Sequence, residues 1–180
     1  GLYCHVSQPP ACLLSDDFED GTIDPSIWTI VKDSWQESGG ELIGTPVKRK
    51  AFIFANGFAG CNNCTIQTTV TTAGGSLAKV WIIGWYQDKN NNIELLLKED
   101  TDRVILKQKS NGRVVRKQKA ILQIDPNVTY AIQLNFDGTS IHVSVDNVEV
   151  LTVAVGSVPF GTAGYQVKNT TAHFGSICVN

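Results

Sequence analysis

The clearest pattern in the sequence is a run of alternating apolar and polar residues between positions 128 and 153. In the segment 140–145 every second residue is aliphatic, and alternate side chains of a strand point to opposite faces. Asp-Gly at 137–138 and Asp-Asn at 146–147 supply residues that tolerate the positive φ angles of tight hairpin turns. The pattern predicts a three-stranded meander whose apolar face packs against a second sheet.

The rest of the chain continues this pattern. No stretch combines a 3.6-residue period with helix caps, so no helix is predicted. Further strands are predicted at 41–44, 50–55, 64–72, 78–87, 92–98, 103–109, 113–121, 162–168 and 172–179. About a dozen short strands predict an all-β, two-sheet antiparallel β-sandwich. We expect an irregular N-terminal arm or linker end at 1–14 and a single domain at 15–180.

Charge and hydropathy narrow the classes of partner that this chain is expected to bind. The formal net charge is -2 and the sequence pI is about 5.9, which argues against a nucleic-acid partner. No apolar run approaches the roughly 20 residues that cross a bilayer, so no membrane span is predicted. The expected partners therefore lie among glycans and proteins.

Five cysteines suggest an oxidising compartment. One interpretation pairs Cys4 with Cys12 and Cys61 with Cys64 in local disulfides and leaves Cys178 as a free thiol. Structural zinc is less favoured, because it normally uses two such pairs or a pair with suitably spaced histidines. Reduced buried thiols are the third alternative. The disulfide interpretation implies a secreted or cell-surface protein.

Four short motifs, in order, resemble the concanavalin A-like (laminin G-like) jelly-roll domains. These are D-D-F-E-D-G at 16–21 with a following Trp28, W-Y-Q-D-K-N-N at 85–91, the F-D-G and V-D-N pair at 136–147, and G-T-A-G-Y at 161–165 with Phe174. The resemblance covers nearly the whole chain from Ser15 to Asn180 and implies a concanavalin A-like jelly roll. Members with calcium often use an acidic residue of the opening motif, which makes Asp17 and Glu19 the candidate metal ligands. The acidic pair that often follows the closing Phe is absent here.

Laminarinase-like glycoside hydrolases share this jelly roll and carry carboxylates at alternate positions of one strand. The corresponding segment here begins at Glu94, but Leu96 and Lys98 occupy the positions where further carboxylates would stand. Retaining hydrolysis needs two carboxyl groups roughly 5 to 5.5 Å apart. The segment cannot supply that pair, so an enzyme would have to use carboxylates from separate strands.

A carbohydrate-binding site is predicted on the concave sheet. Trp85 could stack on a sugar ring, although a central sandwich strand also needs large core residues. Residues 98–119 hold eight of the 15 basic residues, a cluster suited either to anionic ligands or to a solvated sheet edge. The predicted carbohydrate-binding residues are Trp85, Gln87, Glu94, Lys98, Lys107 and Lys109.

These observations predict a non-catalytic, extracellular, lectin-like accessory module that binds a polysaccharide or glycan, with calcium as the one candidate cofactor. The first alternative is a structural or adhesive module of a surface assembly that binds another protein. The second is a glycoside hydrolase with an atypical carboxylate pair.

Overall fold

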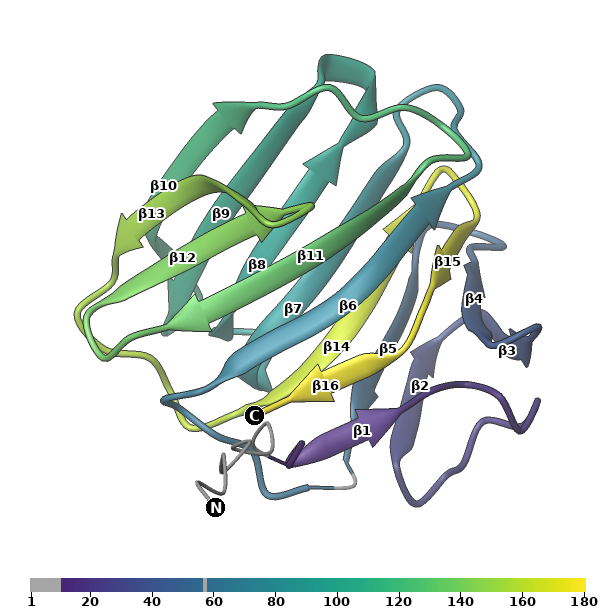
Figure 1. Cartoon of the computed structure of the whole chain (residues 1–180), viewed down its shortest axis with the longest axis horizontal. Coiled ribbons are helices and arrows are strands. Elements are labelled where there is room, and N and C mark those ends of the chain that lie inside the picture. The colour runs from purple at the N-terminus through teal and green to yellow at the C-terminus, as the bar shows by residue number, and fades with distance from the viewer. Residues whose placement is uncertain (1–10, 57) are drawn as a thin grey trace, which may run out of the picture.

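The computed structural model describes residues 11–56 and 58–180, which form two antiparallel sheets packed face to face (Figure 1). The nine-stranded sheet contains β1 (Leu14–Asp16), β3 (Ser34–Ser38), β4 (Glu41–Thr45), β6 (Thr65–Thr72), β11 (Thr129–Phe136), β12 (Ser140–Val145), β13 (Val148–Ala154), β15 (Ala172–Phe174) and β16 (Ile177–Val179). The seven-stranded sheet contains β2 (Trp28–Lys32), β5 (Ala51–Ala55), β7 (Lys79–Asp88), β8 (Asn91–Lys98), β9 (Arg103–Ser110), β10 (Arg113–Ile121) and β14 (Thr162–Lys168). A 3-10 turn, η1 (Glu99–Thr101), links β8 to β9.

The predicted two-sheet sandwich and its meander are confirmed. Strands β11, β12 and β13 pair in succession, and their last turn has Asp146 and Asn147 at φ angles of 50° and 64°. The sequence pattern missed β2 and β3, and it merged β15 with β16, which are separated at Gly175. Leu14, expected in the irregular arm, instead begins β1 and is buried.

The core fills the space between the two inner faces. Tyr165 is fully buried, stacks on Phe174 with 3.9 Å between ring centroids, and shares a 2.7 Å hydrogen bond with the hydroxyl of Thr68. The indole of Trp28 donates to Asp16 Oδ2 at 2.8 Å, so the polar edge of this buried ring is satisfied. Burial of such large side chains supplies the main driving force for closing the sandwich.

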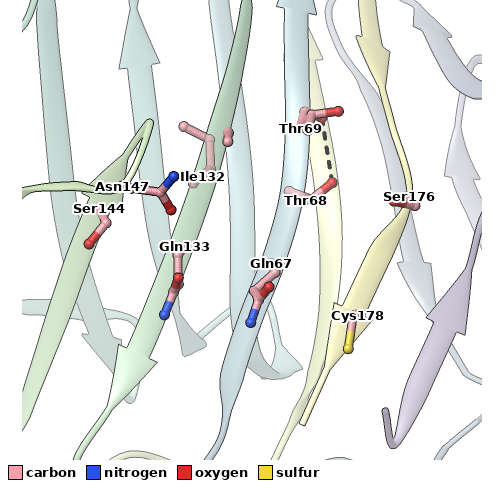
Figure 2. A pocket seen from close by; sticks show the side chains of 10 residues that line it. Gln67, Thr68, Thr69, Ile132, Gln133, Ser144, Asn147, Ser176 and Cys178 are labelled. Carbon is pink, nitrogen blue, oxygen red and sulfur yellow. Dashed lines mark hydrogen bonds between the residues drawn. The ribbon is translucent and has the colours of Figure 1, made fainter. Parts of the chain in front are cut away.

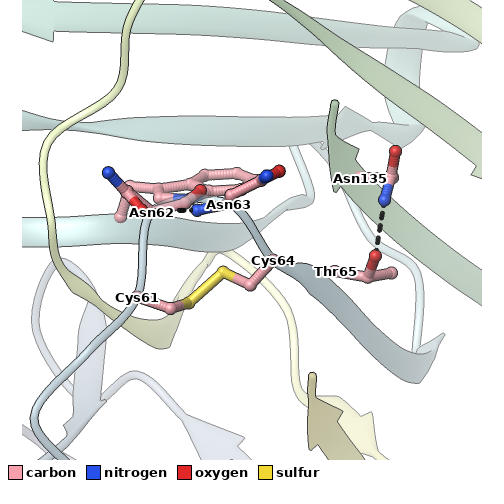
Figure 3. Close-up of a disulfide and its surroundings, with 7 residues drawn as sticks. Cys61, Asn62, Asn63, Cys64, Thr65 and Asn135 are labelled. Carbon is pink, nitrogen blue, oxygen red and sulfur yellow. Dashed lines mark hydrogen bonds between the residues drawn. A yellow bond between two sulfur atoms is a disulfide. The ribbon is translucent and has the colours of Figure 1, made fainter. Parts of the chain in front are cut away.

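Two disulfides cross-link the described part of the chain. Cys61–Cys64 is confirmed and lies in the segment that leads into β6, beside the hydrogen bond from Asn135 to Thr65 (Figure 3). The predicted partner of Cys12 is wrong: Cys12 bonds to Cys178, 166 positions away, while Cys4 lies outside the described residues. Pairing of β1 with β16 brings these two cysteines together, since Ser15 lies opposite Cys178. No helix in the described ranges is long and apolar enough to cross a membrane.

Candidate functional site

A bulge in β7 decides which aromatic side chains reach the surface. The pairing of β7 with β8 shifts register between Gly84 and Asp88, and Trp85 adopts a positive φ of 47°. Gly161 accommodates the bulge, because a Cβ there would collide with the Trp85 backbone. The bulge turns the Trp85 side chain inward and leaves Tyr86 on the outer face of the sheet.

The prediction that Trp85 stacks on a ligand is therefore wrong. Its side chain is 1% exposed, packs edge-on against Phe136 and donates from Nε1 to the carbonyl of Asn62 at 2.7 Å. A ring held in the core by packing and a hydrogen bond cannot offer a face to a sugar. Strict alternation from Trp81 and Ile83 would place Trp85 on the outer face, and the bulge reverses this.

The outward aromatic residues are Phe52, Phe54 and Tyr86. All three are partly exposed, and the ring centroids of Tyr86 lie 5.6 Å from Phe52 and 5.2 Å from Phe54. The signal for the two phenylalanines is present in the sequence A-F-I-F-A at 51–55, where Ala and Ile occupy the buried positions and Phe the alternate ones.

A hollow of about 540 Å³ lies on the outer face of the seven-stranded sheet beside these rings. Its lining combines apolar, amide and charged side chains: Val31, Lys32, Lys50, Phe52, Ile83, Tyr86, Asp88, Lys89, Asn92, Glu94, Lys109 and Gln166. Asn92 is 4% exposed and donates to the Asp88 carbonyl at 2.9 Å, but its Oδ1 has no hydrogen-bond partner among the described residues. Buried acceptors are normally satisfied by protein, water or ligand, so this amide is suited to a polar ligand.

The charged groups of the hollow differ in whether they already form an ion pair or hydrogen bonds within the protein. Glu94 pairs with Lys109, with 3.4 Å between Oε2 and Nζ. Asp88 accepts the backbone N–H groups of Asn90 and Asn91, which lowers its pKa and fixes the β7–β8 turn. Lys50 makes no ion pair with any described residue and is half-buried. The lining therefore offers lysine charge that is not neutralised by its own carboxylates.

The structure brings together only part of the predicted carbohydrate site. Glu94 and Lys109 line the hollow. Lys107 lies opposite Glu94 on β9, and Lys98 follows on the same face of β8, but neither lines the hollow. Lys98 pairs with Asp100 at 3.9 Å, and Glu94 pairs with Lys109. Gln87 is exposed and donates to the carbonyl of Phe160 at 3.3 Å, outside the lining.

A second hollow of about 220 Å³ lies over β6, β11 and β16 of the nine-stranded sheet (Figure 2). Its side chains are mostly small or amide-bearing, including Gln67, Thr69, Gln133 and Ser144, and none of the described residues that line it is aromatic or charged. Sugar rings bind through aromatic faces together with convergent polar groups. The larger hollow on the other sheet is therefore the stronger candidate site.

The predicted metal ligands, Asp17 and Glu19, are exposed in the loop after β1. Asp17 Oδ1 accepts the backbone N–H of Glu19 at 3.1 Å. No three His, Cys, Asp or Glu side chains of the described chain converge as a metal site would require. Ca²⁺ takes six to eight oxygen ligands, so a site here would depend largely on backbone carbonyls. The side chains alone do not fit the ion, and calcium binding stays a prediction.

Solved structures with the same architecture place the fold among the concanavalin A-like jelly rolls. The carbohydrate-binding module CBM66 from Bacillus subtilis superposes with a TM-score of 0.73 at 19% identity, covering 89% of this chain and 97% of that one. A lichenase from a mouse hindgut metagenome gives a TM-score of 0.75 at 13% identity, with coverages of 93% and 98%. A Bacillus licheniformis β-glucanase gives 0.68 at 14% identity, with coverages of 94% and 98%.

No protein-family model matches the chain, and no curated protein matches its sequence significantly. At identities below 20%, the structural likeness establishes the fold and leaves the function to be argued from the site.

Proposed function

We propose that this protein is a non-catalytic, extracellular carbohydrate-binding module, and that the hollow beside Tyr86 and Phe52 holds the sugar. The observation that carries the proposal is a hollow of about 540 Å³ that combines partly exposed aromatic rings with amide and charged side chains. Tyr86 and Phe52 would contact the apolar face of a sugar ring, while Asn92 and Gln166 would exchange hydrogen bonds with its hydroxyl groups.

Two further observations support this function. CBM66 is itself a carbohydrate-binding module of this fold, and several other structural neighbours are glucanases. The two disulfides favour an oxidising, extracellular compartment.

A glycoside hydrolase is the second candidate, because Asp88 and Glu94 line the same hollow. The geometry favours binding over hydrolysis. On β8 the outward positions after Glu94 are Leu96 and Lys98, and the carboxylates of Glu94 and Asp88 are held by Lys109 and the β7–β8 turn. Release of reducing sugar from β-glucans, abolished by Glu94→Gln, would establish the hydrolase instead.

The proposal is tested by a glycan array that includes neutral and acidic polysaccharides, run with calcium and again with chelator. Tyr86→Ala and Phe52→Ala should each weaken binding about tenfold, the effect of losing roughly 1.4 kcal/mol of ring contact. Ile121→Ala is the matched control, since it removes an apolar side chain that is 83% exposed on β10, outside the hollow.

Three outcomes of this test bear on the carbohydrate site and the function, and a fourth bears on the metal. Binding that is lost in both aromatic variants and kept in the control supports the module. Binding that survives both variants moves the site elsewhere, and silence of the whole array favours the structural or adhesive alternative. The predicted metal would be established if chelator abolishes glycan binding, added calcium restores it, and Asp17→Asn does not bind even with calcium.

A further inference from the structure

The basic residues of this chain are segregated to one sheet. Eleven of the 15 Lys and Arg residues lie on strands of the seven-stranded sheet: Lys32, Lys79, Lys98, Arg103, Lys107, Lys109, Arg113, Arg116, Lys117, Lys119 and Lys168. The other four, Lys48, Arg49, Lys50 and Lys89, lie in loops that join its strands or lead into them. In the part of the chain that the structure describes, no strand of the nine-stranded sheet carries either residue type.

Acidic residues do not balance this distribution. The strands of the seven-stranded sheet hold only two, Asp88 and Glu94, whereas those of the other sheet hold Asp16, Glu37, Glu41 and Glu149. The strands of the seven-stranded sheet therefore carry eleven basic residues against two acidic ones, although the whole chain has a net charge of -2. A fixed patch of this kind attracts anionic ligands even when the whole protein is slightly acidic.

Four of the basic residues form a row across neighbouring strands. Lys168 of β14 lies opposite Lys79 of β7, Lys79 opposite Lys98 of β8, and Lys98 opposite Arg103 of β9. Directly opposite residues share a face, and neighbouring strands are about 4.8 Å apart, so the row spans roughly 14 Å. We call Lys168, Lys79, Lys98 and Arg103 the cationic row.

The cationic row is unfavourable to the folded protein without a ligand. Like charges directly opposite each other on a sheet repel. One acid, Asp100, reaches the row, with its Oδ1 3.9 Å from Lys98 Nζ. The Nε of Arg103 is buried and has no hydrogen-bond partner among the described residues. An anion along the row would relieve the repulsion and supply an acceptor.

The cationic row lies beside a mostly apolar one on the same face. Gln166, Trp81, Leu96 and Ile105 lie opposite one another, two positions along each strand from the cationic row, and Phe52 extends this second row on β5. Trp81 and Phe52 are partly exposed. Apolar side chains flanked by regularly spaced cations suit a chain of sugar rings that carries acidic substituents, because rings and charges are both met.

We propose that the outer face of the seven-stranded sheet binds an anionic polysaccharide, whose carboxylate or sulfate groups contact the cationic row. This inference rests on the proposed carbohydrate-binding function and names its ligand class. Lys50, the residue before β5, links the row to the hollow, since it lines the hollow and lies near Lys168. Burial, followed by the charges of Lys32 and Lys109, lowers the pKa of Lys50, and a bound anion would favour its charged form.

The test uses three polymers with one backbone: neutral dextran, carboxymethyl dextran and dextran sulfate. Affinity is measured by calorimetry at low and at physiological salt for the wild type and Lys79→Gln/Lys98→Gln. The matched control is Gln36→Glu/Gln67→Glu, which changes the net charge by the same amount through exposed residues of the nine-stranded sheet. Both charged dextrans should bind the wild type, and removal of two row lysines should weaken binding at least tenfold.

The control variant should bind the charged dextrans nearly as tightly as the wild type does. Added salt should weaken the binding of both proteins to both charged dextrans. Equal losses in the two variants would overturn the inference, because the net charge and not the row would then decide affinity. Binding of neutral glycans that depends on Tyr86 but not on Lys79 and Lys98 would also overturn it, and would leave the carbohydrate function standing. If oligo(dT) binds as tightly as the charged dextrans, the row does not distinguish a polysaccharide from other polyanions. That result would overturn the assignment of a glycan as the anionic ligand. If no polysaccharide binds at all, the proposed function itself fails.

Discussion

The disulfide between Cys12 and Cys178 is expected to contribute more to stability than any other single bond in the described chain. It joins residues 166 positions apart, so in the unfolded state it closes nearly the whole chain into a loop. The loop-closure relation gives about 5 kcal/mol for a loop of this length, against about 2 kcal/mol for the three-residue separation of Cys61 and Cys64. The native contacts it secures are few: β1 pairs with β16 through three residue pairs.

The perturbation is Cys12→Ser/Cys178→Ser on a Cys4→Ser background, with Cys4→Ser alone as the control. Urea unfolding followed by intrinsic tryptophan fluorescence gives the free energy of unfolding of each. We expect the control to keep the wild-type value and the triple variant to lose roughly 3 to 5 kcal/mol. A loss below about 1 kcal/mol would refute the loop-closure reasoning for this bond. A loss of roughly 3 to 5 kcal/mol in Cys4→Ser alone would instead assign Cys4 a structural partner.

The remaining predictions concern two buried side chains. Trp85→Ala should lower the free energy of unfolding by roughly 3 to 5 kcal/mol, because it empties a core position that is 1% exposed, and the still-folded fraction should keep its glycan affinity. A variant with normal melting behaviour and lost affinity would return Trp85 to the binding site. For Glu37, burial and the neighbouring Asp20 and Asp16 carboxylates raise the pKa to about 7. The folded state then holds a proton that the unfolded state releases above about pH 4.5, so this residue makes stability fall as pH rises from about 4.5 to 7. Glu37→Gln should remove that slope in urea unfolding measured across the range, and an unchanged slope would contradict the assignment.

Alternation along single strands is a local property, and it was enough to predict the architecture. The aliphatic residues of 140–145 sit on the buried face of β12, and the strands predicted at 92–98 and 113–121 lie within a residue of β8 and β10. Side-chain direction in a regular strand follows from the backbone alone, so a hydrophobic pattern of period two carries this information. The same alternation in A-F-I-F-A at 51–55 encodes the outward direction of Phe52 and Phe54.

The tertiary structure decided whatever depends on pairing between distant strands. The bulge at Trp85 reversed the inside–outside pattern of β7, because it forms only where β7 meets β8 and Gly161 approaches from β14's side. Cys12 found Cys178 because β1 docks on the C-terminal strand. The cationic row exists only through the registers that set Lys168, Lys79, Lys98 and Arg103 opposite one another. Strand register between segments as far as 165 positions apart is fixed by packing of the whole sandwich, and no local pattern encodes it.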